Sequence, residues 1–70
     1  MKIATYWKIT TKFYDSGKVR AEICSFTNDH LPVNYYKNNG EFVVYVDYFD
    51  NEQQARKFYQ IFKFIDTLKT

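Results

Sequence analysis

Cysteine, proline and glycine are scarce in this 70-residue chain, which has one Cys, one Pro and two Gly. A single cysteine excludes an internal disulfide and a zinc site built from several cysteines, and it fits a reducing compartment. Both glycines lie at turn signals, so the chain has no glycine-rich loop of the kind that holds phosphates. The sequence therefore predicts no cofactor.

Long hydrophobic runs are also missing. No segment approaches the roughly 20 apolar residues that cross a bilayer, and Lys or Thr interrupts the N-terminal stretch too often for a signal peptide. We expect no membrane association and a cytoplasmic location.

Catalytic and metal-binding patterns are weak. The only histidine, His30, is six positions from Cys24, with no third group to orient the pair. The acidic residues Asp47, Asp50 and Glu52 match no calcium-loop spacing. We expect no metal site, and we predict that the protein is not an enzyme.

Aromatic side chains are abundant, with one Trp, seven Tyr and seven Phe making up 21% of the residues. A domain of this size buries only about 60% of the surface of its unfolded chain, and each aromatic side chain can bury roughly 150–250 Å². Some of this aromatic surface must therefore stay exposed or be covered by a partner. An alternative explanation is an AT-rich genome, whose codons would enrich Tyr, Phe, Lys, Asn and Ile.

The net charge of +2 is segregated along the chain. Residues 1–26 are basic, residues 27–52 are acidic and residues 53–70 are basic. A wholly basic nucleic-acid binder would not be expected to carry that acidic middle.

Period-two alternation predicts a β-hairpin over residues 2–27. Odd positions from Ile3 to Phe13 alternate with Lys, Tyr and Thr, which is typical of a half-buried strand. The turn signal at Asp15, Ser16 and Gly17 precedes a second strand, whose apolar side is formed by Val19, Ala21 and Ile23.

Residues 28–40 predict a loop with a short edge strand around Val33–Tyr36, because Pro32 is tolerated only at an edge or a strand start. The letters KNNG after this strand indicate a hairpin turn. Residues 41–49 predict a central strand, because apolar side chains occur on both of its faces.

Residues 51–68 predict a helix. Asp50 is expected as its N-cap, with Gln53 completing a capping box. Phe64 falls on the far side of the apolar stripe and is expected to be exposed or part of an interface. The predicted buried stripe consists of Ala55, Phe58, Tyr59, Ile61, Phe62 and Ile65.

These elements predict one α+β domain over residues 1–70. A three- to four-stranded antiparallel sheet carries one C-terminal helix on one face, in the order β-β-(β)-β-α. Trp7 is expected to be buried under the helix. The second sheet face is expected to be open to water.

Binding to a protein is the function that these features favour. Tyr and Arg are enriched at interface hot spots, and several aromatic residues have no evident place in a one-sided core: Tyr35, Tyr36, Tyr45, Phe49 and Phe64. The expected partner is another protein, and a homodimer is a second candidate. The predicted contacts are the open sheet face and two loop tyrosines, namely Tyr6, Lys8, Lys12, Tyr14, Arg20, Tyr35 and Tyr36.

The alternative is single-stranded nucleic-acid binding by the same open face. Bases stack on exposed aromatic rings, while Lys and Arg meet phosphates. Alternating Lys and Tyr residues on one strand, such as Lys8 and Tyr6, suit that chemistry.

The strand-to-helix junction FDNEQQARKFYQ, residues 49–60, resembles that of very small phage and mobile-element proteins, among them a type I-F anti-CRISPR protein. The resemblance implies a small inhibitor that binds a host protein or protein complex of a defence system, in the cytoplasm of a bacterial host cell. It transfers no binding residue, because the matching positions are mainly helix cap and core. The similarity is carried by Phe49, Asp50, Glu52, Gln53, Phe58 and Tyr59.

Overall fold

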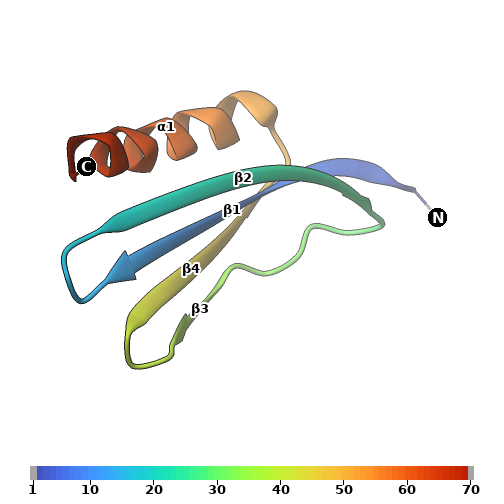
Figure 1. Ribbon diagram of the computed structural model, residues 1–70. Helices are drawn as coiled ribbons and strands as arrows, with labels where there is room; N and C mark the ends of the chain where they lie inside the picture. The colour runs from blue at the N-terminus through green and yellow to red at the C-terminus, as the bar shows by residue number, and fades with distance from the viewer. Residues whose placement is uncertain (1, 70) are drawn as a thin grey trace.

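The computed structural model describes residues 2–69, and the side chains of residues 2–65. Four strands precede one helix, and they form one antiparallel sheet in the order β2-β1-β4-β3 (Figure 1). The helix packs on one face of the sheet, so the predicted α+β architecture is confirmed, with four strands. The elements are β1 (Ala4–Tyr14), β2 (Val19–Asn28), β3 (Tyr35–Asn38), β4 (Phe42–Phe49) and α1 (Glu52–Lys69).

The β1–β2 hairpin follows from the alternating pattern. Ile9 lies opposite Ile23 in a continuous antiparallel register, so the apolar sides of the two strands coincide. Gly17 closes the turn with φ of +90°, and its amide donates to the carbonyl of Tyr14 at 2.9 Å. Glycine adopts this left-handed conformation without the steric cost that a side chain would add.

The strand β3 lies at the sheet edge, as expected, but two residues later than Val33–Tyr36. Asn34 is the reason, because its side-chain Oδ1 accepts a hydrogen bond from the amide of Tyr48 at 2.7 Å. A side chain thus takes the place that a backbone carbonyl would occupy in the ladder. The predicted central position of β4 is confirmed, since it pairs with both β1 and β3.

The helix α1 begins at Glu52, one residue later than the predicted helix, which started at residue 51. Asn51, and not Asp50, is the N-cap: its Oδ1 accepts from the amide of Gln54, and its carbonyl accepts from the amide of Ala55, both at 3.0 Å. Asn and Asp are about equally good N-caps, so the choice between these neighbours depends on where the chain leaves β4.

The core lies between α1 and the half of the sheet formed by β2 and β1. Ile9 and Ala55 are both 0% exposed, and the small Ala55 side chain lets the helix approach the sheet closely. All fifteen aromatic side chains lie within the described residues, and none of them is buried. Thr11, Val19 and Ala21 are also buried on this side, whereas Val46 is buried on the opposite face of the sheet.

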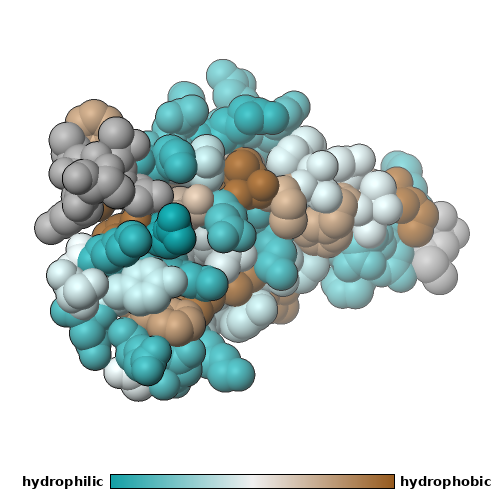
Figure 2. Space-filling model, in the orientation of Figure 1, coloured by the Kyte–Doolittle hydropathy of each residue, from teal (hydrophilic) through white to brown (hydrophobic). Residues whose placement is uncertain are grey.

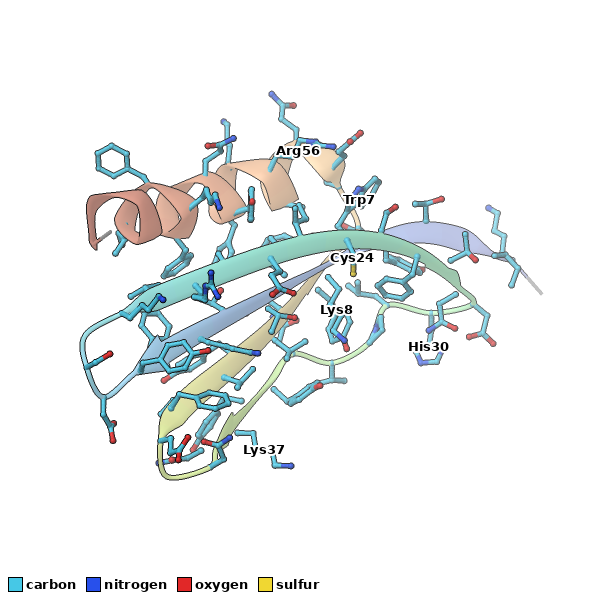
Figure 3. All side chains as sticks on the ribbon, in the orientation of Figure 1. Trp7, Lys8, Cys24, His30, Lys37 and Arg56 are labelled. Carbon is cyan, nitrogen blue, oxygen red and sulfur yellow. The ribbon has the colours of Figure 1, made fainter. Side chains whose placement is uncertain are left out.

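Two side chains predicted for the core are more exposed than expected. Trp7 lies on the helix side beside the start of α1, near Arg56, but it is only half-buried (Figure 3). Ile61 is 58% exposed. Trp7 lines a hollow with Glu52 and Arg56 of the first turns of α1, so the helix covers it only in part. Ile61 lies six residues after the buried Ala55, and the helical period turns it toward the outer side of α1.

Asn51→Ala is expected to lower the free energy of unfolding by about 1 kcal/mol, because the first turn of α1 loses its cap. In a domain of this size that loss lowers the melting temperature by roughly 4–8 °C. The matched control is Asp50→Ala, because the Asp50 carboxylate accepts no hydrogen bond within the described residues. A larger loss in the Asp50 variant would show that Asp50 is the true cap.

Candidate functional site

The strand register assigns every sheet side chain to one of two faces. Thr11 lies opposite both Ala21 and Tyr45, so the odd-numbered residues of β1, β2 and β4 share the helix side. The even-numbered residues form the opposite face. Tyr36 pairs with Tyr45 and lies on the helix side, whereas Tyr35 lies on the opposite face.

The face opposite the helix is basic, and we call it the basic face. Six of the seven predicted contact residues lie on it, and Tyr36 does not. Lys8 projects from this face together with Cys24 (Figure 3). The charged and tyrosine side chains of the basic face are Lys8, Lys12, Arg20, Lys37, Glu22, Tyr6, Tyr14, Tyr35 and Tyr48.

One end of the basic face is less open than expected. Pro32 of the β2–β3 connection lines a small hollow together with Lys8, Cys24, Phe26 and Tyr48. The rings of Phe26 and Tyr48 meet edge to face at 5.8 Å. Both rings are half-buried, so less of their surface is open to a stacking base than on a fully exposed ring.

At the other end of the basic face, a lysine lies over one ring of a packed aromatic pair. Tyr14 and Phe42 pack at 5.0 Å between ring centroids, and the Lys12 ammonium lies 5.5 Å from the centre of the Phe42 ring. Tyr14 is half-buried in this arrangement, and Tyr6 is likewise half-buried against Phe26. Tyr35 is the most exposed aromatic residue here, at 52%.

A groove opens on the helix side, between α1 and β4. The groove exists because α1 covers β2 and β1 and leaves the helix side of β4 and β3 uncovered. Figure 1 shows the wide separation of α1 from β3. Its volume is about 430 Å³. We call it the aromatic groove, and it is lined by Thr11, Phe13, Val43, Tyr45, Asp47, Phe58 and Phe62.

A continuous row of rings crosses this groove from the sheet edge to the helix. Tyr36 stacks on Tyr45 at 5.7 Å, and Tyr45 meets the edge of Phe13 at 5.6 Å. Phe13 meets Phe62 at 5.8 Å, and Phe62 packs on Phe58 at 5.0 Å. Each such pair adds about 0.5–1.5 kcal/mol beyond its buried area, so the apolar lining is held in place before any partner arrives.

Two polar groups lie in this apolar lining. Thr11 is 1% exposed, and its hydroxyl oxygen has no hydrogen-bond partner among the described residues. Asp47 forms no ion pair within the described part of the chain, and burial raises the pKa of its carboxyl group. An unsatisfied buried polar group costs about 1–3 kcal/mol. The groove is therefore not optimised for stability alone.

The other reactive side chains do not come together. His30 contacts its neighbour, with 2.6 Å between its Nδ1 and the Asp29 carboxylate, in an exposed loop. Within residues 2–65, no three His, Cys, Asp or Glu side chains gather into a group that could hold a metal ion. The one helix is not long and apolar enough over its described residues to cross a membrane.

No family model matches this chain, and comparison with curated proteins and with solved structures also gave no match. The resemblance of residues 49–60 to small phage proteins therefore stays a prediction. Functional inference rests on the two surfaces described above.

The aromatic groove was only partly visible in the sequence. Its signal was the surplus of aromatic residues, and Tyr36, Tyr45 and Phe64 are indeed 68%, 44% and 64% exposed. Phe49 was wrongly placed among the surplus, because it is half-buried against Phe58 at 5.3 Å.

Asp47→Asn is expected to stabilise the protein at neutral pH. Burial raises the pKa of Asp47 above its ordinary value of 3.8, so the folded protein holds this proton more tightly than the unfolded chain does. As the pH rises from the ordinary pKa of aspartate to the raised pKa of folded Asp47, the free energy of unfolding falls, and it stays lower above that range.

Urea unfolding should show equal stabilities in acid, below the ordinary aspartate pKa, and a growing advantage of the variant toward neutral pH. The exposed carboxylate of Glu41 supplies the control, and Glu41→Gln should show no comparable gain. A loss of stability in Asp47→Asn at neutral pH would mean that the carboxylate has a stabilising partner.

Proposed function

We propose that this protein acts by binding and not by catalysis, and that its aromatic groove receives an apolar helix of a partner protein. The observation that supports this most directly is the groove itself, in which rings from β1, β4 and α1 border the uncovered half of the sheet. Tyr36 and Tyr45 at its outer wall are 68% and 44% exposed. Exposed contiguous apolar surface on a small domain commonly marks a partner site.

The dimensions suit a helix. Four strands about 4.8 Å apart make a sheet roughly 19 Å wide, and an α-helix with its side chains is about 10–12 Å across. The helix α1 occupies one half of that width, over β2 and β1. The uncovered half, over β4 and β3, is thus about as wide as a second helix.

The large exposed surface of the molecule also supports a binding function. Figure 2 shows brown hydrophobic residues at the surface among teal hydrophilic ones on the side in view. The accessible surface is 5193 Å², whereas a folded monomer of 8.5 kDa typically exposes roughly 4,700 Å². The chain presents more surface than its mass requires.

The resemblance of residues 49–60 to small phage proteins suggests what kind of protein is bound. A protein of this kind would occlude a host protein complex, as a small phage-encoded inhibitor does. That part of the proposal depends on the resemblance alone, and the groove supports only the binding of a protein.

A peptide-display selection on the immobilised protein tests the groove. We expect enriched peptides with apolar residues at i, i+3, i+4 and i+7, the spacing of one helix face. Their affinity should fall at least about tenfold in Tyr45→Ser, as for an interface anchor. Chemical shifts of the bound protein should change around Tyr45 and Phe62, and peptides that bind Tyr45→Ser equally well would contradict the proposal.

Nucleic-acid binding by the basic face is a second candidate. Four cations and one acidic residue occupy this face, and Tyr35 is exposed beside Lys37. Phosphate contacts would lie along Lys8, Lys12 and Lys37. The packed rings at both ends of the face leave fewer stacking platforms than the sequence suggested.

Titration of labelled single-stranded oligonucleotides across salt concentration tests this second candidate. Counterion release predicts that the logarithm of the affinity falls linearly with the logarithm of the salt concentration. Lys12→Glu and Lys8→Glu should each abolish binding, and Tyr45→Ser on the other face should not change it. Absence of binding at low salt would remove the candidate.

A further inference from the structure

The outer surface of α1 carries an exposed apolar stripe of its own. Lys57, Ile61 and Phe64 follow one another at i, i+4 and i+7, so they share one side of the helix. Ile61 is 58% exposed and Phe64 is 64% exposed. Ala55, which is 0% exposed, points to the sheet, and the helical period turns the stripe away from it. We call these three residues the outer stripe.

The outer stripe and the aromatic groove complement each other. The stripe presents two large apolar side chains and one cation, Lys57. The groove presents aromatic rings and one carboxylate, Asp47, which has no ion pair among the described residues. A surface that matches another surface of the same chain can associate with itself.

A two-fold axis brings both pairs of surfaces together at once. If two copies face each other with their helices in one shared layer, α1 of each copy lies over the uncovered β4–β3 half of the other sheet. Each outer stripe then points into the partner's groove, and the contact is made twice, as in an isologous interface. The shared layer holds two helices between two sheets, which matches the width of each sheet.

The seam between the two helices is apolar in this arrangement. The flank of α1 that borders the groove carries Phe58 and Phe62, and Ile65 follows Phe62 at i+3. The basic residue Arg56 lies on the opposite flank, where it pairs with Glu52 at 3.0 Å between Nη2 and Oε2. Like charges from the two copies therefore do not meet at the seam.

We infer that the aromatic groove receives α1 of a second copy of this chain, in a two-fold dimer whose outer stripes each fill the partner's groove. This inference depends on the proposed function of the groove and names its occupant. It accounts together for the exposed Phe64 and Ile61 of the helix and the exposed Tyr36 and Tyr45 of the sheet.

Sedimentation equilibrium over a wide concentration range tests the dimer with three variants. Phe64→Gln removes a ring of the outer stripe, and Tyr36→Ser removes a ring of the groove wall. Two-fold symmetry applies each change twice, so each should weaken dimerisation by at least about a hundredfold. The matched control is Tyr35→Ser, the neighbouring exposed strand tyrosine on the basic face, which should dimerise like the unmodified protein.

A mixture of the Phe64→Gln and Tyr36→Ser proteins gives a sharper test. One stripe and one groove stay intact in the mixed dimer, and they face each other. The mixture should therefore associate about tenfold more tightly than either variant alone. If association does not recover, the contact is not stripe into groove, and the inference is wrong.

Two further outcomes would overturn the inference. A protein that stays monomeric at every concentration does not use its own α1, although peptides selected on the groove could still uphold the proposed function. A dimer that survives both Phe64→Gln and Tyr36→Ser uses another surface. All variants change exposed side chains, and their dispersed amide spectra should confirm that the fold is retained.

Discussion

One α-helix covers a four-stranded sheet that is nearly twice as wide as the helix, and most features of this protein depend on that mismatch. Ala55 is 0% exposed, and its small side chain lets α1 pack closely on the sheet, where the helix contacts β2 and β1 most. The side chains of β4 and β3 on the same side then lack a cover. The aromatic groove, the exposed outer wall of tyrosines and the exposed flank of α1 are consequences of this placement.

The composition of the groove shows a conflict between stability and another requirement. Aromatic pairs such as Tyr45 with Phe13 stabilise the fold and keep the rings in place. Asp47 and the Thr11 hydroxyl, in contrast, lie among these rings without partners in the described part of the chain. Sequences that break a local rule of packing commonly do so at functional sites. The unpartnered polar groups of the groove therefore agree with a role in binding another protein.

The two faces of the sheet offer different chemistry. On the basic face, aromatic rings pack against one another, as Tyr6 does against Phe26, and the β2–β3 connection covers one end. Cations remain at its surface, and these suit an anionic partner. On the helix side the rings are open toward the uncovered half of the sheet. The neighbouring residues Tyr35 and Tyr36 are divided between these faces, which makes them matched reporters of the two surfaces.

Local patterns in the sequence predicted the elements well. Alternation from Ile3 to Phe13 predicted the first strand, the turn residues near Gly17 predicted the hairpin, and the change of period after Phe49 predicted the helix. Such patterns depend only on neighbours along the chain, so no tertiary information was needed. The excess of aromatic residues likewise indicated that part of the apolar surface would stay uncovered.

The groove could not be predicted in the same way, because it depends on register and on the seat of the helix. Residues 42–49 are apolar on both sides, and only the pairing of Tyr45 with Thr11 decides which side faces α1. Tyr36 joins that side through its own pairing with Tyr45. The chain by itself determined which segments become strands and helix and that aromatic surface is in excess. Only the tertiary structure decided where that excess gathers, because strand pairing and the close approach at Ala55 join residues far apart in the sequence.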